Sequence, residues 1–174
     1  RRKLCHGRAP QATVYRHVDG NLSKNTTVMV WRGTELAHEA IKHGCDVVRS
    51  PGAYCYFDMY QDAPGTQPVA NGGFIPTEKV YSYVPGSDLP EAERNMITGV
   101  QANLWTEHIP TPEYAEYMLY PRALALAEIG WNGTKTKNYP EFKTRALAQV
   151  EHLKAEGVKR FELKKALTSP DASC

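Results

Sequence analysis

Aromatic side chains follow three apolar runs of the sequence, and carboxylates stand close to them after two of the three. Trp31 closes the first run, and Tyr56 follows the second run, two residues before Asp58. Trp105 closes the third run, two residues before Glu107. An indole face can stack on the C–H face of a pyranose ring, and carboxylates accept charge-assisted hydrogen bonds, about twice as strong as neutral ones, from its hydroxyls. Together the five residues predict a carbohydrate pocket, provided that the fold brings them to one place.

Each of these residues also has an ordinary structural explanation. A tryptophan at the end of a strand more often packs in a core or an interface than against a ligand. Glu107 could cap the entry to the helix that begins near Pro112, and Asp58 could be a turn residue. The residue types alone leave both interpretations open.

The first three elements that must position these residues form a compact unit. Residues 26–31 (TTVMVW) are a short β-branched run that predicts a buried strand. A helix is expected over residues 35–43, capped by Thr34 and ended by Gly44. Residues 46–49 predict a second strand, so the order is strand–helix–strand, as in a parallel crossover.

The stretch of residues 51–90 predicts a long functional loop. It holds six of the twelve prolines and the aromatic cluster around Tyr56. A loop of this length inside a compact chain is usually functional. We expect one helical turn over residues 76–81 and a short helix over residues 90–95 with Asp88 as its cap.

The remaining sequence predicts one more strand followed by helices. Residues 97–105 alternate polar and apolar side chains, which indicates a third strand. A long helix is expected over residues 112–131, with Pro121 in its interior or at a break. A last amphipathic helix covers residues 139–156. The order fits the α/β class, as about the last three strand–helix units of a partial (β/α)8 TIM barrel, because a whole barrel needs about 200 residues or more.

Composition excludes several other classes. The 174 residues carry 21 basic and 19 acidic side chains, so the formal net charge is 21 − 19 = +2. We therefore expect no nucleic acid and no membrane as partner, since no apolar run approaches the ~20 residues of a membrane span. The cysteines and histidines show no metal-ligand spacing, so no metal and no organic cofactor is implied. A Cys45–Cys55 bridge is possible beside the commoner alternative of buried thiols.

Five motifs, in this order and spacing, resemble the C-terminal half of the catalytic barrel of family 20 glycoside hydrolases, the β-N-acetylhexosaminidases. The resemblance covers about residues 21–157, with an atypical N-terminal segment over residues 1–20 and a tail over residues 158–174. The motifs are VMVWRG (28–33), GCDVVRSP (44–51), YCYFDMYQ (54–61), GVQANLWTE (99–107) and YPRALALAEIGW (120–131).

The resemblance implies retaining, substrate-assisted hydrolysis, in which the 2-acetamido oxygen of the substrate attacks the anomeric carbon. By the matching motifs, Tyr56 would hold that oxygen, Asp58 and Glu107 would bind outer hydroxyls, and Trp31 and Trp105 would wall the pocket. The implied ligand is a glycan that contains an N-acetylhexosamine, and the implied compartment is periplasmic, secreted or lysosomal.

One further position departs from the family pattern. Tyr83, in the segment SYVP, stands where many relatives carry a tryptophan that stacks on the next sugar. A tyrosine there puts the affinity for that next sugar in doubt.

The catalytic part of the family pattern is missing. The Asp-Glu pair that supplies the acid should precede Trp31, and residues 1–30 hold no such dipeptide. We expect this chain alone to be inactive and to need the missing N-terminal half of the barrel. Unpaired strand edges also predict a homo-oligomer, a rearranged fold or marginal stability. The alternatives are a non-catalytic carbohydrate-binding module and a domain whose aromatic residues only pack.

Overall fold

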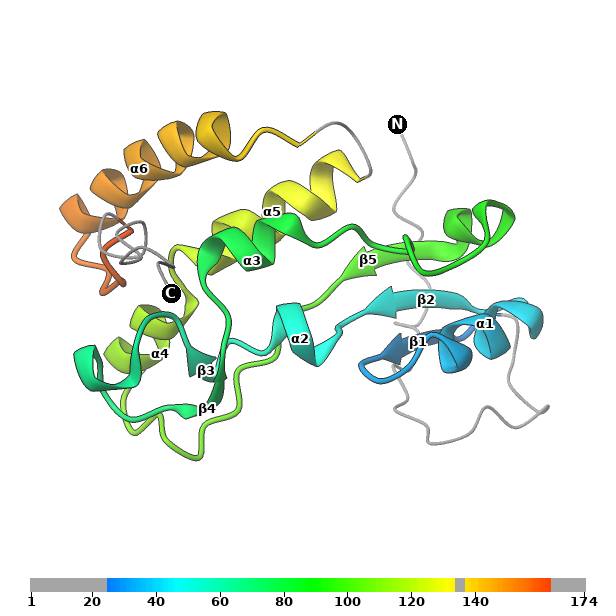
Figure 1. Ribbon diagram of the computed structural model, residues 1–174, viewed down its shortest axis with the longest axis horizontal. Coiled ribbons are helices and arrows are strands. Elements are labelled where there is room, and N and C mark those ends of the chain that lie inside the picture. Colours follow the sequence, from blue (N-terminus) through cyan, green and yellow to red (C-terminus); the bar gives the residue numbers. More distant parts are fainter. Residues whose placement is uncertain (1–24, 134–136, 164–174) are drawn as a thin grey trace, which may run out of the picture. The chain divides into compact units, whose positions relative to one another are not determined.

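The computed structural model describes residues 25–133 and 137–163, and the chain divides into two compact units (Figure 1). The first unit comprises residues 1–49 and 86–99, and the second comprises residues 50–85 and 100–174. The predictions for residues 1–20 and for the tail beyond residue 163 lie outside the described residues.

The first unit contains the predicted strand–helix–strand. Strands β1 (Thr27–Val30) and β2 (Asp46–Arg49) run parallel, with Thr27 opposite Asp46 and Val30 opposite Arg49. Helix α1 (Glu35–Lys42) connects them, and β5 (Ile97–Val100) completes the sheet in the order β1-β2-β5. The predicted strand–helix–strand order is therefore confirmed. The buried side chains of this unit are Val28, Val30, Ala37, Ala40, Cys45, Val47 and Leu89.

Thr34 stands at the predicted N-cap position of α1, whereas the cap expected at Asp88 is wrong. The side chain of Thr34 makes no capping bond to α1, because its hydroxyl donates to Asp88 Oδ2 at 2.5 Å. Asp88 Oδ2 also accepts from Arg49 Nη2 at 2.6 Å. The short 3₁₀ helix η2 (Glu91–Met96) therefore begins after Pro90, without a side-chain cap. The Thr34 hydroxyl and Asp88 Oδ2 are thus used in hydrogen bonds between residues distant in the sequence, which sequence spacing does not reveal.

The predicted long loop contains several short elements of the second unit. The helical turn expected over residues 76–81 is present, and the strands β3 and β4 pair in parallel. These elements are too short to show a period in the sequence. They are α2 (Gly52–Cys55), β3 (Met59–Tyr60), η1 (Pro64–Thr66), β4 (Asn71–Phe74) and α3 (Thr77–Ser82).

One more expected element differs from the structure, and for another the structure decides between two alternatives. The strand β5 ends at Val100, so the extended segment that leads to Trp105 is joined to a neighbour by a single bridge at Asn103. The expected long helix is two helices, α4 (Pro112–Leu119) and α5 (Arg122–Asn132), which break at Pro121 as that residue allows. The last helix, α6 (Tyr139–Ala155), agrees with the prediction.

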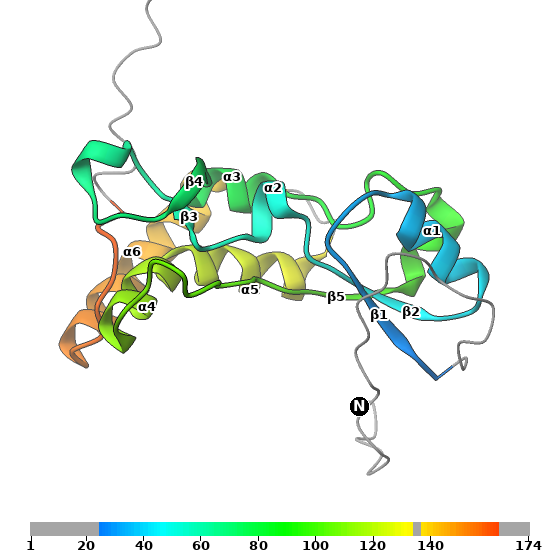
Figure 2. The same ribbon diagram turned by 90° about the horizontal axis from the view of Figure 1, so that it is seen from below.

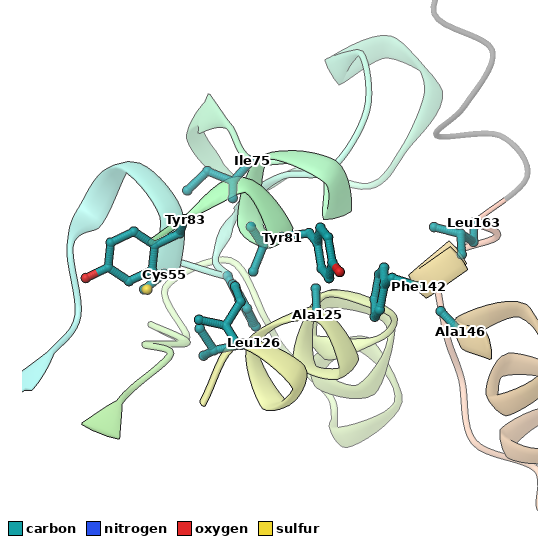
Figure 3. Close-up of a cluster of buried hydrophobic side chains, with 12 residues drawn as sticks. Cys55, Ile75, Tyr81, Tyr83, Ala125, Leu126, Phe142, Ala146 and Leu163 are labelled. Carbon is teal, nitrogen blue, oxygen red and sulfur yellow. The ribbon is translucent and has the colours of Figure 1, made fainter. Parts of the chain in front are cut away.

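Helices α3, α5 and α6 build the core of the second unit. Helix α3 lies alongside α5 in both ribbon views (Figures 1 and 2). The rings of Tyr81 and Phe142 stack with centroids 4.5 Å apart, and Ala125 lies beneath them (Figure 3). The chain remains packed to its last described residues, because Phe161 and Leu163 are buried. Among the described helices, none is long and apolar enough to cross a membrane.

The cysteines that the sequence left open are thiols. Cys45 lies in the first unit and Cys55 in the second, and both are fully buried. Burial raises the pKa of the Cys45 thiol. These two residues therefore act as small core side chains, which was the commoner of the two alternatives.

Two tyrosines of the second unit should ionise late in an alkaline titration. Burial raises the pKa values of Tyr117 and Tyr139 to about 12. Because the folded pKa lies above the unfolded value near 10, their contribution to stability is present below pH ~10 and is lost as the pH rises toward ~12. Ultraviolet absorbance should show one late-ionising tyrosine fewer in Tyr139→Phe than in the wild type, in which burial also raises the pKa values of Tyr81 and Tyr114. Uniform ionisation near pH 10 in the folded protein would contradict this.

Candidate active site

The predicted site residues are divided between the two units. Trp31 follows β1 in the first unit, where it is half-buried and the Arg32 guanidinium carbon lies 4.2 Å from its ring centroid. The other five candidates belong to the second unit. The convergence of Trp31 with them on one recess therefore stays a prediction.

Main-chain hydrogen bonds join the segment of Tyr56 to the segment of Trp105. The amide of Phe57 donates to the carbonyl of Asn103 at 2.7 Å, and the amide of Asn103 donates to the carbonyl of Cys55 at 2.8 Å. Tyr56 and Asn103 thus form a parallel bridge. The structure brings together two of the three predicted strand ends in this way, although neither is part of a regular strand.

Trp105 and Glu107 lie on the surface of the second unit. Trp105 is 54% exposed, and Glu107 is also exposed. Trp105 is therefore not a core residue of this unit. Contact of Trp105 and Glu107 with a ligand stays a prediction.

Asp58 is enclosed by protein. The residue is only 4% exposed, and its Oδ2 accepts from Asn71 Nδ2 at 2.8 Å. The amide of Asn71 also donates to the Asp58 carbonyl at 2.9 Å. Within the described residues, Asp58 Oδ1 is buried without a hydrogen-bond partner. A buried acceptor of this kind calls for an explanation, which the ordinary role of a turn residue does not provide.

Tyr83 is buried and packs against another tyrosine. Its ring is 6% exposed and stacks on Tyr54, with centroids 5.0 Å apart and an interplanar angle of 24°. One face of the ring is therefore occupied by protein. A contact of Tyr83 with a second sugar stays a prediction.

Arg122, which the sequence analysis did not single out, holds the segment that carries Tyr56 and Asp58. Its side chain is completely buried, and it also lies over the Phe57 ring at 4.9 Å. Nη2 donates to the carbonyl of Phe57 at 2.5 Å, and Nη1 donates to that of Met59 at 2.9 Å. Further bonds reach the carbonyls of Ile75 and Met118. The guanidinium thus fixes the main chain on both sides of Asp58.

The charge of Arg122 is maintained despite its burial. Burial lowers the pKa of Arg122 to about 9, and the charges of Asp58 and Tyr117 oppose this shift. The guanidinium therefore remains protonated at neutral pH, and Asp58 is the carboxylate that balances it. This provides one physical reason for a buried Asp58.

A cavity of about 580 Å³ lies elsewhere in the second unit, between α5 and α6. None of the six candidate residues lines it. Within residues 25–133 and 137–163, no three His, Cys, Asp or Glu side chains gather as metal ligands. The arrangement around Tyr56 can donate and accept hydrogen bonds and offer an aromatic surface.

Removing Arg122 should destabilise the second unit strongly. Arg122→Met leaves several buried carbonyls without donors, so we expect a loss of about 3 kcal/mol or more in the free energy of unfolding. Arg145→Met is the matched control, because Arg145 is exposed and forms a surface ion pair with Glu128 at 2.6 Å. That variant should change stability far less. Urea denaturation of both variants measures the difference, and equal effects would contradict the anchoring role of Arg122.

Comparisons with known proteins find relatives of one enzyme family. The family model for "Glycosyl hydrolase family 20, catalytic domain" matches residues 12–134. A beta-hexosaminidase of Porphyromonas gingivalis is 40% identical over 130 residues, covering 74% of this chain and 17% of the relative. An N,N'-diacetylchitobiase of Vibrio harveyi is 28% identical over 134 residues, covering 64% of this chain and 15% of the relative.

Solved structures are similar over the same region. The GH20 exo beta-N-acetylglucosaminidase of Vibrio harveyi, in complex with N-acetylglucosamine, aligns with a TM-score of 0.69 and 31% identity over 82% of this chain and 23% of its own. The Streptomyces plicatus N-acetyl-beta-hexosaminidase in complex with Thio-NAglucal has a TM-score of 0.68 and 28% identity over 79% and 29%.

The predicted α/β class is confirmed by these likenesses. The chain spans only 17% and 18% of the length of its beta-hexosaminidase relatives from Porphyromonas gingivalis and Vibrio furnissii. Because the family model matches 123 of the 174 residues, from residue 12 to residue 134, this chain belongs to glycosyl hydrolase family 20.

Proposed function

We propose that this chain is a piece of a retaining, substrate-assisted β-N-acetylhexosaminidase that removes terminal N-acetylglucosamine or N-acetylgalactosamine from glycans. In this proposal, residues 21–157 form about the last three strand–helix units of a (β/α)8 barrel and supply the substrate pocket. The observation that carries the proposal is the parallel bridge between Tyr56 and Asn103. It joins the two segments that hold Tyr56, Trp105 and Glu107.

Tyr56 would act on the acetamido group of the substrate. Its phenol O–H would donate a hydrogen bond to the acetamido carbonyl oxygen and hold that oxygen for attack on the anomeric carbon. Holding the two atoms at attack distance makes the step intramolecular, which is worth up to about 7–11 kcal/mol where the geometry is ideal. The main-chain bonds on both sides of Tyr56 support such a positioning role.

The aromatic and acidic residues would stabilise the cationic intermediate. The oxazolinium-like product of the first step carries positive charge, which indole faces and carboxylates attract in a site that excludes water. Trp31 and Trp105 would provide the faces, while Glu107 and Asp58 would accept hydroxyl hydrogen bonds. For Asp58 this requires that a sugar hydroxyl reach an oxygen that protein now encloses.

The acid that protonates the leaving oxygen must come from outside this sequence. Residues 1–30 contain no Asp-Glu pair, and a preceding half of the barrel would supply one. The location of the whole enzyme is also part of the proposal. It would act in the periplasm, outside the cell or in a lysosomal compartment.

A non-catalytic carbohydrate-binding module is the second candidate. The exposed Trp105 and the missing Asp-Glu pair favour it. The two candidates differ in the parent reading frame, since an Asp-Glu pair encoded upstream of Arg1 would support the enzyme.

The purified chain should bind a pocket ligand without hydrolysing a substrate. We expect measurable heat on titration with N-acetylglucosamine-thiazoline, and a loss of most of that affinity in Trp105→Ala because the stacking surface is removed. Trp131→Ala is the control, since Trp131 is 90% exposed and lines the separate α5–α6 cavity. Release of nitrophenol from a nitrophenyl N-acetylglucosaminide by the chain alone would contradict the proposed division of the enzyme.

The chain should also associate with itself at high concentration. In the three-stranded sheet, β1 and β5 are the outer strands, and a parallel sheet with open edges can pair with further strands. Light scattering over a range of concentrations should show a mass above 19.5 kDa. A single monomeric species that melts cooperatively would count against a partial barrel.

A further inference from the structure

We infer that Asn103 is a positioning residue that sets the place of Tyr56 relative to Trp105 and Glu107. The inference rests on the proposed function, in which these three residues contact one N-acetylated sugar. It adds a residue whose own side chain does not need to touch the sugar.

The main chain of Asn103 brackets Tyr56. Its carbonyl accepts from the Phe57 amide at 2.7 Å, and its amide donates to the Cys55 carbonyl at 2.8 Å. Both bonds are short and go to the residues directly before and after Tyr56. A displacement of Asn103 therefore moves the main chain on both sides of Tyr56 and with it the Tyr56 side chain.

The side chain of Asn103 is tied at both of its polar ends. Nδ2 donates to Ser50 Oγ at 2.9 Å, and Oδ1 accepts from Gln101 Nε2 at 2.9 Å. Ser50 is completely buried, so this end of the bond has a fixed partner. A carboxamide offers one donor group and one acceptor group, and neither alanine nor an ionised aspartate can make both bonds.

Asn103 lies only a few residues before the two side chains that we propose contact the ligand. Trp105 follows Asn103 by two residues and Glu107 follows by four. Among the described residues no strand follows Val100, and the Ser50 bond, the Tyr56 bridge and the packing of Ala102 and Leu104 locate this segment in the second unit. Misplacing a positioned group by about 1 Å can cost on the order of 100-fold in rate.

The experiment compares Asn103→Ala and Ser50→Ala, which remove the two ends of one bond. We expect each to weaken binding of N-acetylglucosamine-thiazoline about tenfold by calorimetry, and the double variant to be no weaker than either. Asn95→Ala is the control, because Asn95 is exposed in the first unit. It should leave the affinity unchanged. Ser50→Ala is a small change that keeps the test available if Asn103→Ala fails to fold.

A double-mutant cycle with Tyr56→Phe separates positioning from general stability. If Asn103 acts through the Tyr56 hydroxyl, Asn103→Ala should weaken binding of the thiazoline about tenfold when Tyr56 is intact. In the Tyr56→Phe background the same substitution should leave the affinity almost unchanged. A purely structural role would cost the same in both backgrounds, and that result would overturn the inference.

Amide hydrogen exchange provides a test without ligand. Ser50→Ala and Asn103→Ala should accelerate exchange of the Phe57 amide at least tenfold relative to Asn95→Ala. Failure of the wild type to bind the thiazoline would overturn the proposed pocket, while unchanged Phe57 exchange would overturn the inference even if the sugar binds. The two failures are thus distinguishable.

Discussion

The buried charge of Arg122 is the constraint on which the second unit depends. A guanidinium without solvent contact must satisfy its donors within the protein, and here carbonyls from four residues accept them. Those carbonyls belong to segments that are far apart in the sequence. Because leaving a buried charge without partners costs several kcal/mol, none of these segments can move away from Arg122 without a large loss of stability. Arg122 thus holds the main chain at Phe57 and Met59, on both sides of Asp58.

The candidate site is therefore positioned mainly by the main chain. Tyr56 is fixed by bonds of its neighbours to Asn103, and Asp58 by its bonds to Asn71. Trp105 and Glu107, which we propose contact the sugar, contribute little to this positioning and remain exposed. A rigid frame with exposed aromatic and acidic groups fits ligand binding, because few groups need to be ordered when the ligand arrives.

The sequence predicted those elements that show a period or a β-branched run. The strand–helix–strand of the first unit and α6 were found to within two residues, because their buried faces repeat regularly. β3 has only two residues and shows no period, so the region 51–90 was predicted as a loop. The strand expected to reach Trp105 ends at Val100, where main-chain bonds to an irregular neighbour replace the ladder.

For the site, the sequence indicated residues that could touch a sugar but none that hold them. Arg122 stands within a quoted motif, yet its bonds to distant carbonyls are tertiary contacts without a local signal. The most direct test of the whole account is a crystal structure of this protein soaked with N-acetylglucosamine-thiazoline. We expect one sugar bordered by Trp31, Tyr56, Asp58, Trp105 and Glu107. A sugar bound elsewhere, or these five side chains on separate surfaces, would contradict it.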